Sequence, residues 1–337
     1  MNAGALKSII ILLLGCLAQA AVEHHTCIPT SYTSICILEY VYYSRNDTTT
    51  HVFPKGHSHV RIGSERWFHS INSIVREFDT KLYNELDRPQ ALEVVNSGMT
   101  SLEIPRALEY ANFADNSLKE FSIESGAGET FLTFLDLSSN ALSNLTNISS
   151  LVNLESLYLS NNEIQTLEPD VFKQLTQLKV LELNQNKITS VPENALPRSL
   201  SSLGLFRNQI RELKYNHISL PSLEVFNIES NHLETFDAAA LLLAMPKLRI
   251  VRFGGNKFDH GVLRTAIVTL QRYNISYRND FDDSSCYYDR ELVDGVCMRD
   301  QYWENGWAKA TGLSILAILV AVLFVLVSRW IFIAMNR

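Results

Sequence analysis

The chain has 337 residues, of which 46% are hydrophobic and 19% are charged, and this composition excludes an intrinsically disordered protein. Its 36 Asp and Glu residues outnumber its 29 Lys and Arg residues, so the formal net charge is −7 at pH 7. Nucleic-acid phosphates need clustered basic side chains, and we therefore expect no nucleic-acid partner.

The first 20 residues have the features of a secretory signal peptide. Lys7 precedes a short apolar run, and the small residues Ala18 and Ala20 stand where a signal peptidase would cut. The alternative is an uncleaved membrane anchor, but the apolar run is short for a membrane span. We expect the mature chain to begin near Ala21, in an oxidising compartment.

Between the two ends of the chain, the template L-x-x-L-x-L-x-x-N-x-L recurs seven times. Its copies begin at residues 108, 132, 154, 178, 200, 223 and 248, and successive template Asn residues are 22 to 25 residues apart. This period is typical of leucine-rich repeats. Leu92–Leu102 is a degenerate eighth copy, with Thr100 at the Asn position.

This template predicts a stack of short parallel strands. Template positions 1, 4, 6 and 11 should point into a core that no single repeat can bury alone. The template Asn should satisfy backbone groups at the turn after each strand, which is a structural role. Among the returning segments, Ala238–Ala244 is rich in Ala and Leu and predicts a helix.

The four cysteines after residue 20 form two close pairs, one on each side of the repeats. Four cysteines allow three connectivities, but the long array between the pairs favours the bridges Cys27–Cys36 and Cys286–Cys297.

Metal binding near the first cysteine pair is the alternative, with His24, His25 and Cys27 as ligands. Secretion and the lack of C-x-x-C spacing argue against it, and we expect no metal and no cofactor. The remaining histidines of the polar segment before the repeats are expected to be solvated: His51, His57 and His59.

Four N-x-S/T sequons predict glycosylation in the extracellular part of the chain, at Asn46, Asn144, Asn147 and Asn274.

Residues 310–328 predict a single transmembrane helix. The stretch has 19 residues and no charge, which at about 1.5 Å per residue is long enough to cross a bilayer. Trp303 and Trp330 flank it, and Arg329 and Arg337 follow it, which predicts a cytoplasmic tail. A lipid-anchor signal is the alternative, but the two arginines interrupt the terminal apolar run.

The candidate binding residues are those that should project from the concave face of the array. Alternate residues of a strand share one side, so template positions 3, 5 and 7 face away from the leucine core. Aromatic side chains beside charged ones are typical of protein-binding hot spots. The candidates are Asp136, Tyr158, Glu182, Phe206, Asn227, Glu229 and Arg252.

With these repeats, cysteine pairs and apolar ends, the sequence resembles extracellular leucine-rich repeat receptors. More narrowly, it is similar to mosquito leucine-rich repeat immune proteins of the short transmembrane type. That resemblance implies recognition of a protein or microbial ligand in innate immunity. Secreted members of that family use a C-terminal coiled coil to pair and to hold complement-like proteins, but no heptad run follows the repeats here, so that partner is not carried over.

We therefore expect an α/β solenoid, a curved horseshoe array with disulfide caps and one C-terminal transmembrane helix. The expected divisions are a signal peptide (1–20), an N-terminal cap and leader (21–90), the array (91–275), a cysteine cap and juxtamembrane segment (276–309), the span (310–328) and a short tail (329–337).

The expected protein is a single-pass type I protein of the plasma membrane with its N-terminus outside the cell. It should bind a protein or microbial surface ligand. The alternative is an adhesion protein or structural co-receptor that associates laterally with other membrane or leucine-rich repeat proteins. No G-x-S-x-G or H-E-x-x-H motif occurs, and we expect no enzyme.

Overall fold

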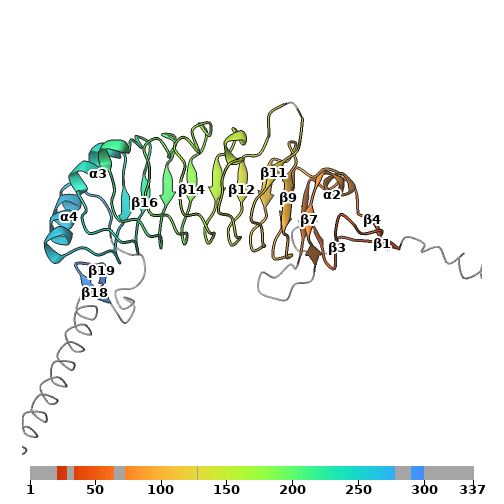
Figure 1. Cartoon of the computed structure of the whole chain (residues 1–337), viewed down its shortest axis with the longest axis horizontal. Coiled ribbons are helices and arrows are strands. Elements are labelled where there is room, and N and C mark those ends of the chain that lie inside the picture. The colour runs from red at the N-terminus through yellow and green to blue at the C-terminus, as the bar shows by residue number, and fades with distance from the viewer. Residues whose placement is uncertain (1–20, 29–33, 64–72, 127, 278–289, 300–337) are drawn as a thin grey trace, which may run out of the picture.

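A computed structural model describes residues 21–28, 34–63, 73–126, 128–277 and 290–299. Ten parallel strands form one continuous sheet, and they lie side by side along the long axis of the molecule (Figure 1). Their order in the sheet follows the chain, so each coil adds one strand and the predicted solenoid is confirmed. The strands are β2 (Ile35–Leu38), β5 (His59–Ile62), β8 (Ala91–Val94), β10 (Tyr110–Asn112), β12 (Phe134–Asp136), β13 (Ser156–Tyr158), β14 (Val180–Glu182), β15 (Ser202–Gly204), β16 (Val225–Asn227) and β17 (Ile250–Arg252).

The core is built from the template positions that the sequence predicts. In β14 the central residue Leu181 is fully buried, whereas its neighbours Val180 and Glu182 are half-buried on the opposite face of the sheet. The other core side chains of this coil are Leu178, Leu183 and Ile188. Because each layer of leucines is covered only by the layers beside it, the core runs the length of the array.

The template asparagines join neighbouring coils through their side-chain amides. Asn162 accepts a hydrogen bond at Oδ1 from the Leu142 backbone N–H (2.9 Å). Its Nδ2 donates to the carbonyls of Leu137 (2.9 Å) and Leu159 (3.1 Å). The predicted structural role is confirmed, and equivalent bonds are made by Asn116, Asn140, Asn186, Asn208, Asn231 and Asn256.

The sheet continues into the segment that the sequence pattern assigns to the N-terminal cap. Cys36 of β2 pairs in register with Val60 of β5, and Val60 pairs with Leu92 of β8. These positions are 24 and 32 residues apart, and their coils lack the template Asn, so pattern matching does not find them. Two further coils therefore precede the repeats that the template identifies.

On the other side of these first coils, short strands form smaller parallel sheets. A three-stranded sheet has the order β11-β9-β7, and β3 pairs with β6. Their bounds are β3 (Tyr42–Tyr43), β6 (Ile74–Val75), β7 (Glu77–Phe78), β9 (Ser101–Ile104) and β11 (Ser122–Ile123).

The N-terminal segment covers the free edge of β2. The disulfide Cys27–Cys36 confirms the first predicted bridge, and an antiparallel bridge joins Ile28 to Ile37 of β2. Beside it, β1 (Val22–His24) pairs in parallel with β4 (Thr50–Val52). The edge of the sheet, which would otherwise be open to pairing with another chain, is thereby occupied.

Helices replace part of the returning segments and close the far end. The predicted helix is confirmed as α3 (Ala238–Ala244), which begins where the Asp237 side chain accepts from the backbone N–H of Ala239 and Ala240. The last coil is followed by α4 (His260–Arg272), whose apolar face of Leu263, Ala266, Ile267 and Leu270 is buried. The other helices within the described ranges are α2 (Thr80–Glu85) and the 3₁₀ turns Ile148–Ser150 and Tyr215–His217.

A hairpin of β18 (Arg290–Val293) and β19 (Val296–Arg299) contacts the last coil. The Gly255 N–H donates to the Cys297 carbonyl (2.6 Å). Cys297 is disulfide-bonded, and Cys286, its predicted partner, lies outside the described residues.

The two apolar ends of the chain also lie outside the described residues, at 1–20 and 310–328. Among the residues that the structure does describe, no helix is both long enough and apolar enough to cross a membrane.

The asparagine bonds predict the effect of one substitution. Asn186→Ala leaves the buried Ile164 N–H without its partner and removes one of the two side-chain bonds to the Leu159 carbonyl, and it should lower the free energy of unfolding by about 1–3 kcal/mol. Urea denaturation measures this change. The neighbouring Lys187→Ala removes only an exposed ion pair with Glu163 and should cost less than about 1 kcal/mol. Equal effects of the two substitutions would contradict the structural role.

Candidate functional site

The outward face of the ten-stranded sheet, here called the sheet face, brings side chains of neighbouring coils into rows. Tyr158 lies in register between Asp136 and Glu182 on the adjacent strands. Farther along the same row, Asn227 is in register with Arg252. All seven residues predicted from the template are half-buried: Asp136, Tyr158, Glu182, Phe206, Asn227, Glu229 and Arg252.

A hydrogen-bonded path links Glu182 to Phe206 at the centre of this face. Glu182 Oε2 accepts from Asn184 Nδ2 (2.6 Å), and Asn184 Oδ1 accepts from the Phe206 backbone N–H (2.9 Å). The Glu182 carboxylate lies over Gly204, where an added Cβ would be 1.9 Å from Oε2. Gly204 therefore leaves the space that this carboxylate occupies, and Asn184 is a residue of the site that the sequence analysis did not select.

Aromatic rings form a second row on the sheet face. Tyr110 stacks on Phe134 with ring centroids 4.3 Å apart and an interplanar angle of 9°. Phe134 in turn contacts Tyr158 at 5.3 Å. Tyr110 and Phe134 occupy template position 3, so the template places them on this face, although neither is among the seven predicted residues. The three rings thus form one continuous aromatic surface across three neighbouring strands.

Two carboxylates border this aromatic row without forming an ion pair with any residue that the structure describes. Burial raises the pKa of Asp136 and of Glu182 above the ordinary values of these groups. Asp136 accepts from the Ser138 backbone N–H (2.8 Å), and Glu182 accepts from Asn184. Both are therefore partly desolvated acceptors held beside aromatic rings.

A buried charge cluster lies on the same face toward the N-terminus. Glu93 of β8 is 4% exposed, and it is 2.7 Å from His59 Nε2 and 2.6 Å from Arg61 Nη2, both on β5. Burial alone would raise the pKa of Glu93, but the His59 hydrogen bond and the Arg61 guanidinium hold it below its ordinary value. The His59 ring also contacts Tyr110, with centroids 6.0 Å apart, so the cluster adjoins the aromatic row.

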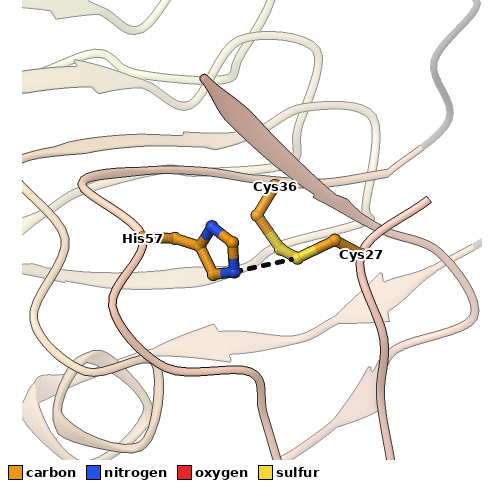
Figure 2. Close-up of side chains that lie close together, drawn as sticks. All are labelled: Cys27, Cys36 and His57. Carbon is orange, nitrogen blue, oxygen red and sulfur yellow. Dashed lines mark hydrogen bonds between the residues drawn. A yellow bond between two sulfur atoms is a disulfide. The ribbon is translucent and has the colours of Figure 1, made fainter. Parts of the chain in front are cut away.

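The expectation that the three leader histidines are solvated is wrong. His59 contacts Glu93, and His51 is only 7% exposed. His57 Nε2 lies 3.3 Å from Cys27 Sγ, beside the disulfide with Cys36 (Figure 2). The leader lacks the template, but it folds into coils in which His51 is buried and His57 and His59 are half-buried.

The disulfide drawn in Figure 2 involves Cys27, one of the three metal ligands considered from the sequence. Both sulfurs of Cys27 and Cys36 are joined in a disulfide, so Cys27 cannot act as a thiolate ligand beside His24 and His25.

The four predicted glycosylation residues are exposed and lie outside the strands of the ten-stranded sheet. They are Asn46, Asn144, Asn147 and Asn274.

Comparison with known proteins identifies the repeats. A family model described as leucine rich repeat matches residues 152–210. These coils are leucine-rich repeats. Bovine lumican is 31% identical over 159 residues, which is 44% of this chain and 45% of lumican. Human Toll-like receptor 5 is 41% identical over 81 residues, which is 24% of this chain and 9% of the receptor. The chain thus spans less than half of either relative.

A solved structure supports the fold independently. One match is the complex of LRIM1 with APL1C, which are mosquito leucine-rich repeat proteins. The alignment covers 83% of this chain and 53% of the matched chain in the complex, with a TM-score of 0.51 and 16% sequence identity. At this identity the match establishes the shared fold. The predicted resemblance to mosquito leucine-rich repeat proteins is thereby confirmed at the level of the fold.

The Glu93 cluster predicts a pH-dependent contribution to stability. Because the folded-state pKa of Glu93 is lowered, its ionised form stabilises the fold above about pH 4.5 and loses this effect as the pH falls through the folded-state pKa. Wild type should exceed Glu93→Gln in unfolding free energy by about 1–3 kcal/mol at pH 7, and the difference should shrink below about pH 4.5. Denaturant titrations from pH 3 to 7 measure it.

The matched control is Glu163→Gln, which removes an exposed carboxylate paired with Lys187. Its effect should stay below about 1 kcal/mol across the same range. A Glu93→Gln difference that is independent of pH would mean that the cluster does not hold an ionised carboxylate.

Proposed function

We propose that this chain is an extracellular recognition protein of innate immunity, which binds a protein or microbial surface ligand on its sheet face. Three features support an extracellular location: the Cys27–Cys36 disulfide, the predicted signal peptide, and similarity to lumican and Toll-like receptor 5. The single observation that carries the binding proposal is the aromatic row of the sheet face, bordered by carboxylates that have no cationic partner in the described structure.

The aromatic row supplies the apolar part of the proposed contact. Tyr110, Phe134 and Tyr158 touch one another across three strands, so their rings are held in place before a ligand arrives. Large, rigid aromatic side chains lose little conformational entropy on contact, and they dominate the energetics of protein interfaces. A ligand that covers these rings would therefore gain affinity without first ordering them.

The flanking carboxylates indicate the charge of the ligand. Asp136 and Glu182 lie on either side of Tyr158, and parallel strands are about 4.8 Å apart, so the two strands that carry them are about 10 Å apart. A Lys or Arg side chain placed over the Tyr158 ring would contact the ring face and lie next to a strand that carries one of these carboxylates. We infer a ligand that presents a basic side chain within an apolar surface.

The predicted glycans leave this face open. Asn144 and Asn147 belong to the segment between β12 and β13, not to the strands themselves. Sugars at these positions would cover the returning side of the coils, and the sheet face would remain accessible to a large partner.

Substitutions on the sheet face test the binding proposal. Residues 21–305, fluorescently labelled, are incubated with bacterial cells and with animal cells, and bound protein is measured by flow cytometry. Tyr158→Ala should weaken binding about 5- to 150-fold, equivalent to about 1–3 kcal/mol, because it removes the central ring. Gly204→Ala should also weaken binding, because the new methyl group displaces the Glu182 carboxylate.

The matched control is Leu243→Ala, which removes an apolar side chain that is 86% exposed on α3, away from the sheet face. It should leave binding unchanged. Circular dichroism should show that every variant keeps the wild-type fold. If Tyr158→Ala and Phe206→Ala both bind as wild type does, the sheet face is not the site. Absence of any binding by wild type would instead favour the lateral co-receptor.

We also propose that residues 310–328 anchor the protein in the plasma membrane as a type I span. Full-length protein expressed in cells should stay with the membrane pellet after washing with alkaline carbonate, because an apolar helix of this length is stable only in the bilayer. Release by carbonate would contradict an integral anchor, and release by a phosphatidylinositol-specific phospholipase would indicate the lipid-anchored form.

A further inference from the structure

A second cluster of side chains lies at the N-terminal end of the array, outside the sheet face. There β1 and β4 run side by side (Figure 1), with Glu23 in register with His51. Alternate residues of an extended chain share one face, so His25 projects on the same side as Glu23, whereas His24 projects on the other. The pairing therefore places one carboxylate and two imidazoles on one face of this two-stranded ribbon.

The three ligand atoms of this cluster converge on one point. His25 Nε2 is 3.0 Å from His51 Nδ1, and Glu23 Oε2 is 3.6 Å from His51 Nδ1 and 3.9 Å from His25 Nε2. A point equidistant from the three atoms lies about 2 Å from each, which is the ordinary length of a bond from zinc to imidazole nitrogen or carboxylate oxygen. The spacing fits three ligand atoms of a single ion.

The surroundings hold both rings in position. The His25 ring stacks on Phe53 with centroids 4.7 Å apart and an interplanar angle of 16°, and the His51 side chain is 2% exposed. Nε2 of His51 is buried and has no hydrogen-bond partner among the described residues. Nδ1 is therefore the nitrogen of this ring that contacts polar atoms, those of His25 and Glu23. Glu23 is 45% exposed, which leaves the cluster open to water on one side.

We propose that Glu23, His25 and His51 bind one Zn²⁺ ion, with water at the fourth position. Two imidazoles and a carboxylate with one open position match the ligands that zinc accepts in proteins. The ion replaces the proton of the His25–His51 hydrogen bond, and it joins His25 to a residue 26 positions later in the chain. By joining residues next to β1 and within β4, the ion stabilises the capped end of the solenoid. This site does not depend on the ligand proposed for the sheet face.

Zinc titration of the full-length protein, first stripped of metal with EDTA, tests this proposal. Isothermal titration calorimetry with ZnCl₂ should give one site per chain, and the midpoint of thermal unfolding should rise with zinc. Co²⁺ added in place of Zn²⁺ should produce the visible absorption bands of a four-coordinate ion with nitrogen and oxygen ligands.

Three variants separate this site from other histidines. Glu23→Gln should weaken zinc binding at least tenfold, and His25→Gln should abolish both the binding and the thermal shift. His24→Gln changes the exposed neighbour on the opposite face and should bind as wild type does. Glu23→Gln is the decisive variant, because this side chain is partly exposed and its loss should not disturb folding. The proposal is overturned if wild type neither binds zinc nor gains thermal stability, or if all three variants bind alike.

Discussion

The fold depends on one constraint: a coil of this protein cannot bury its own leucines. Leu181 is covered by the layers on either side of it, and the same holds for every layer along the array. Stacking also brings polar backbone groups of neighbouring coils together in an apolar interior, where unpaired groups would be costly. The asparagine amides form hydrogen bonds with these groups. The leucines and the asparagines therefore stabilise the same contacts between neighbouring coils. The ends then need separate closure, which the Cys27–Cys36 segment and α4 supply.

The same constraint leaves the sheet face free for other uses. Side chains at template positions 3 and 5 alternate with the core residue of each strand, and they contribute little to stacking. Their identity can therefore vary from coil to coil, as the change from Tyr158 to Glu182 and then Gly204 shows. Glu93 is a buried carboxylate on this face, and its two partners, His59 and Arg61, both come from the adjacent strand β5.

The sequence predicts the strands correctly where the repeat template is complete, and it misses them where the template is absent. The strands β10 and β12 to β17, the asparagine bonds and the helix α3 follow from local residue patterns, and the structure has them as expected. The strands β2 and β5 could not be found in this way, because their coils have unequal lengths and no template Asn. The Arg61–Glu93 pair was missed for the same reason, since it exists only when these two strands are neighbours. The Tyr110–Phe134 stack, by contrast, follows from the template, which places both residues at position 3 of neighbouring strands, although neither is among the predicted binding residues.

The fixed register has a consequence for how a partner can lie on the molecule. Coil length varies, with 32 residues from Val60 to Leu92 but 19 from Leu92 to Ala111, yet the three residues remain directly paired across the sheet. Side chains on the sheet face therefore repeat at the strand spacing of about 4.8 Å, while an extended peptide advances about 3.3 Å per residue. Because the side chains of an extended peptide alternate between its two faces, those that face the sheet recur about every 6.6 Å. They return to the same position relative to the strands about every four strands and six residues. A linear peptide that crosses the strands would thus be read at about every sixth residue, with the residues between left outside the register.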